Sequence, residues 1–350
     1  MNPAMNLADL NKIANAMVTP GKGILAADES SGTIKKRFDA IKVESTEESR
    51  RDYREMLFRS QEAMSKYISG VILYDETIWQ NAKDGTPLVK LIEQSGAIPG
   101  IKVDEGTQAL PFCPGELVTA GLDKLAERLK KYYERGARFA KWRAVIDIAA
   151  GTGGPGIPSM TAISVNAHAL ARYAALCQAA QIVPIVEPEV LMDGAHDIDR
   201  CYDVTQRVLN KTFQELRVQR VALEGMILKP NMAISGKKCA KQASVDEVAE
   251  KTIRMLKACV PAAVPGVAFL SGGQSDEEAT AHLNAMNAIG HLPWKLTFSY
   301  GRALQAAPQK AWSGRAENVA AGQRAFTHRA RMNALASRGE WANDMEKKAA

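Results

Sequence analysis

The sequence predicts an α/β protein built on a single (β/α)8 TIM barrel with a C-terminal helical tail, and three observations lead to the barrel. Short apolar runs alternate with longer amphipathic stretches, and the alternation repeats eight times along the 350 residues. Eight parallel strand–helix units close naturally into a barrel. The first apolar run is not followed by GxGxxG, which a dinucleotide-binding open sheet usually carries. No linker divides the chain into two domains, so the barrel is favoured over a doubly wound sheet.

The eight apolar runs are strand candidates because they are short and bounded by turn or helix signals. They span residues 23–28, 68–75, 98–104, 137–146, 182–189, 223–231, 266–273 and 295–301. Amphipathic patterns between them predict helices over residues 122–135, 165–180 and 198–216. We assign residues 1–335 to the catalytic barrel domain and residues 336–350 to a polar C-terminal tail.

Three further helices are predicted from their first turns. Serine is followed three residues later by glutamate at residues 45–48, 244–247 and 275–278, which is the spacing of a capping box. We expect the first of these helices to run to about residue 67.

Composition and charge narrow the class of function. Apolar residues make up 46% of the chain and charged residues 24%, as in ordinary globular proteins. The net charge is +6 without any block of basic residues, which favours small anionic substrates over nucleic acid or a membrane surface. The five cysteines are scattered and form no CxxC pair, which favours a reduced cytoplasmic protein. We expect no signal peptide, no membrane span and no metal site, because the histidines have no metal-ligand spacing.

Charged residues collect where the predicted strands end, which is the functional face of a barrel. Because side chains alternate along a strand, Lys141 and Arg143 share one face, and Glu187 shares a face with Glu189. Lys229 lies at the end of the sixth predicted strand, on the same face as two apolar residues before it. If these faces point inward, the charged side chains meet in one space.

Lys229 is the candidate nucleophile. A lone lysine at a strand end is usually a solvated surface charge, but this one closes the apolar run GMIL and precedes a proline. Burying it as an ammonium is costly without partners. Burial and the cations Lys102, Lys141 and Arg143 would instead favour the neutral amine that nucleophilic catalysis needs.

The carboxylates carry competing interpretations. Glu187 is the candidate general acid/base, because imine chemistry must remove and add water. Glu189 is equally explained by a salt bridge in the barrel core. Asp28 ends the first predicted strand, where it is either catalytic or the N-cap of the next segment.

Two phosphate sites are predicted. The loops after strands seven and eight often bind phosphate in barrels, with glycine amides donating to the anion. The candidates there are Ser271, Gly272, Gly273, Ser299, Gly301 and Arg302. Ser30, Thr33 and Lys102 are candidates for a second phosphate on the opposite side. Residues 151–156 (GTGGPG) lack the GxxxxGK[ST] form of a phosphate loop, so we predict an ordinary loop there.

Six segments of the chain together resemble class I fructose-bisphosphate aldolases. They are LAADES (25–30), AKWR (140–143), VPIVEPE (183–189), LKPN (228–231), FLSGGQS (269–275) and FSYGRALQ (298–305). The resemblance implies a homotetrameric Schiff-base enzyme that cleaves fructose 1,6-bisphosphate to dihydroxyacetone phosphate and glyceraldehyde 3-phosphate. Because the iminium is the electron sink, the resemblance implies no metal and no cofactor.

The resemblance also implies a role for each site residue. Lys229 attacks the C2 carbonyl, and Glu187 is the acid/base for dehydration of the carbinolamine and for C3–C4 cleavage. Asp28 orients or deprotonates the C4 hydroxyl, and Lys141 balances the developing charge. The implied substrate contacts are Arg143 and Lys102 with hydroxyls or phosphate, Ser271, Gly272, Gly301 and Arg302 with the C1 phosphate, Ser30 and Thr33 near the C6 phosphate, and Glu189 in support of the lysines.

The chain departs from the family pattern in two places. Animal members end in a tyrosine that assists proton exchange, whereas this chain ends WANDMEKKAA, which is more typical of bacterial members. We expect the substrate phosphate to take over that step. Residues 147–158 are unusually rich in glycine, which leaves open a related aldolase for a single-phosphate ketose. A non-catalytic scaffold on the same fold is the other alternative, but it predicts loss of at least one of the four catalytic candidates, and all four are present.

Overall fold

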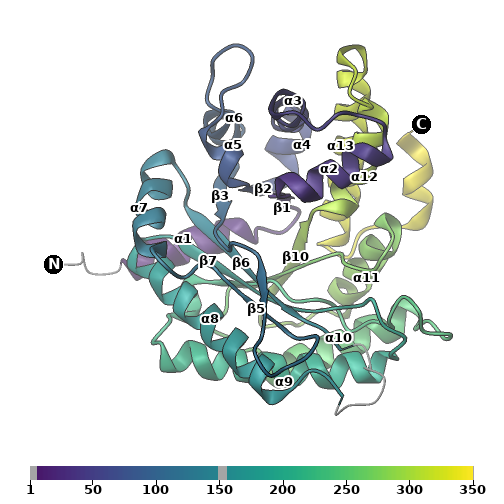
Figure 1. The fold of residues 1–350 in the computed structure, drawn as a ribbon. Helices are drawn as coiled ribbons and strands as arrows, with labels where there is room; N and C mark the ends of the chain where they lie inside the picture. Colours follow the sequence, from purple (N-terminus) through teal and green to yellow (C-terminus); the bar gives the residue numbers. More distant parts are fainter. Residues whose placement is uncertain (1–5, 149–155, 350) are drawn as a thin grey trace.

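A computed structural model of the protein describes residues 6–148 and 156–349. Eight parallel strands form a closed barrel that is surrounded by helices (Figure 1). The predicted fold class is therefore confirmed. The predicted loop at residues 151–156 falls almost entirely outside the described residues.

The barrel strands follow the predicted runs, generally with slightly shorter bounds. They are β1 Gly23–Ala27, β2 Ile68–Leu73, β3 Ile98–Lys102, β6 Phe139–Ile146, β7 Val183–Val190, β8 Ile227–Leu228, β9 Gly266–Phe269 and β10 Lys295–Tyr300. Around the barrel they run β1–β10–β9–β8–β7–β6–β3–β2, and β2 pairs with β1 to close it. All carboxyl ends therefore open on one mouth.

Most of the helices lie between successive strands in the sequence. They are α1 Leu7–Met17, α2 Ser31–Ala40, α3 Glu47–Phe58, α4 Gln61–Lys66, α5 Asp75–Trp79, α6 Leu88–Gln94, α7 Leu125–Arg135, α8 Met160–Ala179, α9 Ile198–Val218, α10 Val245–Cys259, α11 Asp276–Ile289, α12 Arg302–Trp312 and α13 Val319–Ala336. A short hairpin of β4 Thr107–Ala109 and β5 Leu117–Thr119 lies outside the barrel sheet.

The amino end of the barrel interior is filled by apolar side chains. Phe139 lies there against the inward residues of its neighbours, including Ile185 and Ile227, and α1 packs over them. A Cβ atom on Gly100 would come within 2.2 Å of the Phe139 ring, so this glycine makes room for the aromatic side chain. The polar inward-facing residues of the same strands therefore lie at the opposite end of the interior, at the mouth.

The sixth strand is much shorter than predicted. Residues Leu223–Gly225 form a 3₁₀ turn, and only Ile227–Leu228 pair with their neighbours. The side-chain amide of Gln178 on α8 holds the backbone of this turn, accepting from the Ala222 N–H at 2.9 Å and donating to the Ala222 carbonyl at 2.8 Å. The Gln178 amide also donates to the Gly225 carbonyl at 3.2 Å, so the start of the predicted strand is bonded to α8 as a turn and not to a neighbouring strand.

The predicted helix starts were partly wrong. The helix after residue 45 is capped by Thr46 with Ser49 rather than by Ser45 with Glu48, and it ends at Phe58 before the separate helix α4. The helix α11 has the full predicted capping box between Ser275 and Glu278. At α10 the Ser244 side chain caps as predicted. The helices α1, α2, α5, α6 and α12 and the β4–β5 hairpin were not predicted.

The C-terminal residues pack back on the barrel. A 3₁₀ segment, Asn343–Ala349, follows α13, and the Glu346 carboxylate accepts hydrogen bonds at 2.7 Å from Arg329. Glu346 also contacts His328 and Trp341. Across residues 6–148 and 156–349, no helix is long and apolar enough to cross a membrane.

Candidate active site

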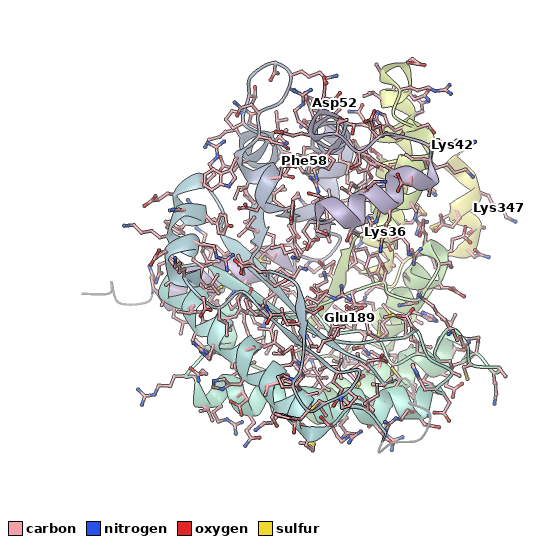
Figure 2. The ribbon with its side chains drawn as sticks, in the orientation of Figure 1. Lys36, Lys42, Asp52, Phe58, Glu189 and Lys347 are labelled. Carbon is pink, nitrogen blue, oxygen red and sulfur yellow. The ribbon has the colours of Figure 1, made fainter. Side chains whose placement is uncertain are left out.

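The mouth of the barrel holds a polar cavity of about 990 Å³. Every site residue predicted from the sequence lines it except Gly273. Figure 2 shows Glu189 near the centre of the molecule, whereas Lys36 and Lys42 are exposed. Among the residues whose burial is described, the buried lysines are Lys141 and Lys229, and both line this cavity.

The alternation of side chains along each strand places the charged side chains in the cavity. On β6 the buried Phe139 is followed two and four residues later by Lys141 and Arg143, and both line the cavity. On β7 and β8 the inward Ile185 and Ile227 lie two residues before Glu187 and Lys229. The period-two alternation inferred from the sequence thus places these groups as expected.

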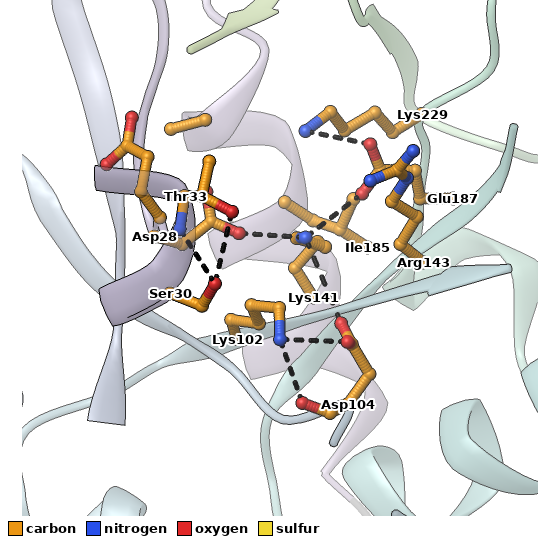
Figure 3. A network of polar contacts seen from close by, with 12 residues as sticks. Asp28, Ser30, Thr33, Lys102, Asp104, Lys141, Arg143, Ile185, Glu187 and Lys229 are labelled. Carbon is orange, nitrogen blue, oxygen red and sulfur yellow. Dashed lines mark hydrogen bonds and ion pairs between the residues drawn. The ribbon is translucent and has the colours of Figure 1, made fainter. Parts of the chain in front are cut away.

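Lys229 and Glu187 form the centre of the site. The Lys229 side chain is buried, and its Nζ atom lies 3.1 Å from Oε1 of Glu187 (Figure 3). The second carboxylate oxygen of Glu187 lies 3.4 Å from Nζ of Lys141. One carboxylate therefore joins the two lysines.

Lys141 is the cation shared by three carboxylates. Its Nζ atom lies 2.8 Å from Oδ2 of Asp28 and 3.9 Å from Oδ2 of Asp104. Burial alone would lower the pKa of Lys141, but these carboxylates outweigh it and raise the pKa. Burial alone would raise the pKa of Asp28, but Lys141 and Lys229 lower it to about 2. Asp28 is therefore ionised at neutral pH, and the N-cap of α2 is Ser30 instead.

Arg143 and Glu189 form a second ion pair beside this centre, through Nε and Oε2. Burial raises the pKa of Glu189 despite the nearby guanidinium, while Glu189 raises the pKa of Arg143 against the effect of burial. We expected Lys102, Lys141 and Arg143 to act on Lys229 as free cations. Each of the three instead has a carboxylate partner, so their field at Lys229 is largely compensated.

The predicted first phosphate site is built from the loops after β9 and β10. Arg302 reaches across these loops, donating to the Gln274 carbonyl and lying 3.2 Å from Oδ1 of Asp276. Ser299 is buried, and its hydroxyl has no hydrogen-bond partner in the described part of the chain. A Cβ atom on Gly272 would meet the Met192 methyl at 2.4 Å. The absence of a side chain at Gly272 therefore lets this loop pack closely against Met192.

The predicted second phosphate site lies around the start of α2. Ser30 and Thr33 pack together there, with their hydroxyl oxygens 3.1 Å apart. Lys102 lies on β3, which is across the barrel from β9, and its Nζ atom is 2.8 Å from Oδ1 of Asp104. Ser30 and Thr33 follow β1, which lies between β3 and β9 on one side of the barrel in the order of the strands.

Several cavity residues were not predicted. Asp104 is one of the charged residues at the predicted strand ends, without an assigned role, and it pairs with both Lys102 and Lys141. Arg37 lines the cavity one helical turn after Thr33, and the spacing of four residues was the available signal. The remaining unpredicted polar lining residues are Glu29, Tyr74, Asp75, Glu105, Thr107, Arg128 and Tyr132.

The site can support covalent chemistry at an amine. A buried lysine contacts a carboxylate that can accept its proton, and further cations can neutralise anionic groups. In residues 6–148 and 156–349, no cluster of His, Cys, Asp or Glu is arranged to hold a metal ion. The fold and this site define a (β/α)8 barrel protein with a buried lysine–carboxylate centre.

Comparison with known proteins gives the family. A family model described as class-I fructose-bisphosphate aldolase matches residues 9–350. A "Probable fructose-bisphosphate aldolase class 1" of Xanthomonas campestris pv. campestris is 57% identical, covering 96% of this chain and 99% of its own. "Fructose-bisphosphate aldolase 1" of Toxoplasma gondii is 54% identical, over 95% and 91% of the two chains.

A solved structure agrees with these sequences. Fructose-bisphosphate aldolase from Plasmodium falciparum, in a complex with TRAP and a small-molecule inhibitor, superposes with a TM-score of 0.93 at 48% identity. The match covers 98% of this chain and 99% of that one. The chain belongs to the class I fructose-bisphosphate aldolase family, and it is a carbon–carbon lyase that works through a lysine Schiff base.

Proposed function

We propose that Lys229 forms the Schiff base and that the substrate is fructose 1,6-bisphosphate. The observation that carries this assignment is the contact of 3.1 Å between the buried Nζ atom of Lys229 and the Glu187 carboxylate. The carboxylate takes a proton from the ammonium, and the free amine attacks the C2 carbonyl to form a carbinolamine. The protonated carboxyl then returns its proton to the leaving hydroxyl, and water departs to leave the iminium.

Cleavage of the C3–C4 bond requires a base and an electron sink. The C4 hydroxyl loses its proton to Asp28 or, through Lys141, to Glu187, both of which lie within 3.4 Å of the Lys141 ammonium. The electrons of the C3–C4 bond move into the iminium, so that an enamine remains on Lys229 and glyceraldehyde 3-phosphate leaves. Protonation of the enamine at C3 and hydrolysis of the iminium release dihydroxyacetone phosphate and restore the amine.

The two groups of phosphate-binding candidates favour a bisphosphate. Ser271, Gly272, Ser299, Gly301 and Arg302, with Gly273 next to Gly272 in the same loop, supply the site for the C1 phosphate, and Ser30, Thr33, Arg37 and Lys102 supply the site for the C6 phosphate. We expect kcat/KM for fructose 1,6-bisphosphate to exceed that for fructose 1-phosphate. The reverse preference would favour the single-phosphate aldolase.

The decisive experiment is reductive trapping. Borohydride added with dihydroxyacetone phosphate should fix an adduct on Lys229, identified by peptide mass mapping. An adduct on another lysine, or no adduct, would overturn the assignment of the nucleophile.

We further propose a cytoplasmic homotetramer. All five cysteines are free thiols, as in a reducing compartment. Phe112 is fully exposed at the tip of the β4–β5 hairpin and precedes Cys113. Met160 is more than half exposed and follows Ser159, whose hydroxyl lies 4.0 Å from the Cys113 sulfur. Apolar side chains exposed together are typical of subunit interfaces. Light scattering coupled to size-exclusion chromatography should give four times the monomer mass, with a smaller species for Phe112→Ser.

A further inference from the structure

The strand that carries Lys229 is held by very few sheet bonds. β8 is two residues long, and it pairs with β7 at only two positions, whereas β6 pairs with β7 at eight. Its pairing with β9 is a single position, Leu228 with Val267. The last bond to β7 runs from the Lys229 N–H to the Val186 carbonyl at 2.8 Å, and the next residue, Pro230, has no N–H to donate. The Pro230 carbonyl accepts from the Leu270 N–H at 3.2 Å, but this bond lies on the β9 side. On the β7 side, the backbone after Lys229 therefore needs another anchor.

Asn231 supplies this anchor two residues further on. Its side chain is 1% exposed. Its Oδ1 atom accepts the Val190 N–H at 3.0 Å, one residue after Glu189. Its Nδ2 atom donates to Oγ1 of Thr205 on α9 at 3.1 Å and to the Met232 carbonyl at 3.0 Å. Both amide hydrogens and the amide oxygen are thus used.

The bonds of Asn231 join the segment after Lys229 to the strand that carries Glu187. The bond to Val190 ties the end of β7 to the segment that follows β8, and the bond to Thr205 ties both to a long helix. A shift between the ends of β7 and β8 would change the contact of 3.1 Å between Lys229 and Glu187 directly. Catalytic groups must be held to a fraction of an ångström, and supporting hydrogen bonds supply that precision.

We propose that Asn231 is a positioning residue that sets the Lys229–Glu187 contact for imine formation. The inference rests on the proposed roles of Lys229 and Glu187. Asn231 does not line the cavity, so it acts through the backbone and not on the substrate. The phosphate-binding candidates lie on other strands, mainly β9, β10 and the start of α2. Loss of the Asn231 amide should therefore slow the chemistry and leave substrate binding nearly intact.

The test compares Asn231→Ala with Asn333→Ala. Asn333 is a matched control, because it is also fully buried, accepts from Thr280 at 2.8 Å and donates to the Arg329 carbonyl at 2.9 Å, but joins α11 to α13 on the outside of the barrel. We expect Asn231→Ala to lower kcat about 10- to 100-fold with KM for fructose 1,6-bisphosphate changed less than about threefold. The rate of borohydride-trapped adduct formation on Lys229 should fall in parallel. Asn333→Ala should lose a similar amount of thermal stability with kcat within about twofold of the wild type.

Three outcomes would overturn the inference. They are an unchanged kcat in folded Asn231→Ala, a rise in KM at constant kcat, and an equal loss of kcat in Asn333→Ala. If the wild-type protein gave no adduct on Lys229, the assignment of Lys229 as the nucleophile would be wrong. That result is distinct from a normal adduct in the wild type and an unchanged rate of adduct formation in Asn231→Ala.

A second pair of variants tests the proposal if Asn231→Ala does not fold. Thr205→Val removes the hydroxyl that accepts from Asn231 and keeps the side-chain shape, whereas Thr205→Ser keeps the hydroxyl. We expect Thr205→Val to slow adduct formation on Lys229 about fivefold and Thr205→Ser to restore most of the rate. Equal rates in the two variants would contradict the role of the amide.

Discussion

The Nζ atom of Lys229 and the Oε1 atom of Glu187 lie 3.1 Å apart at the ends of two neighbouring barrel strands. Both side chains are almost completely buried, at 4% and 3% exposed. A buried ion pair is costly unless its remaining hydrogen-bonding capacity is satisfied. The second carboxylate oxygen of Glu187 lies 3.4 Å from Nζ of Lys141 but accepts no hydrogen bond in the described part of the chain. At 3.1 Å, a proton can pass directly between the amine of Lys229 and Oε1 of Glu187.

The first prediction concerns the nucleophile. Lys229→Met keeps an unbranched side chain of similar length, and Glu187 retains its contact with Lys141 at 3.4 Å. We expect cleavage to fall by more than about 10⁴-fold, because the covalent step is lost. A coupled spectrophotometric assay measures the activity, and circular dichroism measures the melting temperature. Global unfolding of the variant would show that Lys229 is a structural residue instead.

The second prediction concerns the acid/base. Glu187→Gln preserves shape but removes the group that accepts and returns the proton. General acid–base groups contribute about 10² to 10⁴ in rate, so kcat should fall within that range with KM little changed. Rapid-quench borohydride trapping should show slow formation of the Lys229 adduct. A rate of adduct formation equal to that of the wild type would assign the dehydration step to another residue.

Much of the site could be predicted from the sequence because strand parity is a local property. Glu187 and Glu189 have a fixed relation to Ile185 whatever the rest of the chain does, and the same holds for Lys141 and Arg143 relative to Phe139. Because these charged side chains come near the carboxyl ends of the predicted strands, the sequence also indicates at which end of the barrel they lie. The pairing of each cation with its own carboxylate was not predictable, because it depends on distances between strands.

The missed features depend on contacts between distant segments. The turn that replaces the first part of the sixth strand is bonded to Gln178, which lies more than forty residues before it, and no local pattern reveals these bonds. Asn231 is a polar residue at a predicted strand end, and its role becomes visible only when Val190 and Thr205 are placed beside it. The β4–β5 hairpin has strands of only three residues, too short for an alternating pattern to be recognised.

The third prediction concerns stability in mild acid. His282 is buried against Gln274, with Nδ1 and Oε1 2.7 Å apart, and burial lowers its pKa to about 4. In the unfolded chain a histidine titrates near 6.5, so between these values the unfolded state binds more protons. This contribution to stability is complete above pH ~6.5 and is lost as the pH falls toward 4, by about 2 kcal/mol at pH 5.

Urea unfolding at pH 7.5 and pH 5 tests this contribution. His282→Asn keeps an amide donor that can face Gln274 but does not titrate. We expect the wild type to lose about 2 kcal/mol more than the variant between the two pH values. The other histidines titrate in both proteins and cancel in the comparison. An identical pH dependence in the two proteins would mean that His282 is protonated in the folded state.

The fourth prediction concerns the loop after β9, which we propose binds the C1 phosphate. Gly273 has φ +80°, and a Cβ atom there would lie 2.2 Å from Cγ of Met192. Gly273→Ala should therefore displace the loop, destabilise the fold by about 1–3 kcal/mol and raise KM for fructose 1,6-bisphosphate about tenfold. Gly96 is the matched control, since it has φ +83° but nothing within 4 Å of its Cβ position. Gly96→Ala should carry the backbone cost alone and leave KM unchanged. Equal KM values for all three proteins would show that the loop does not bind the phosphate.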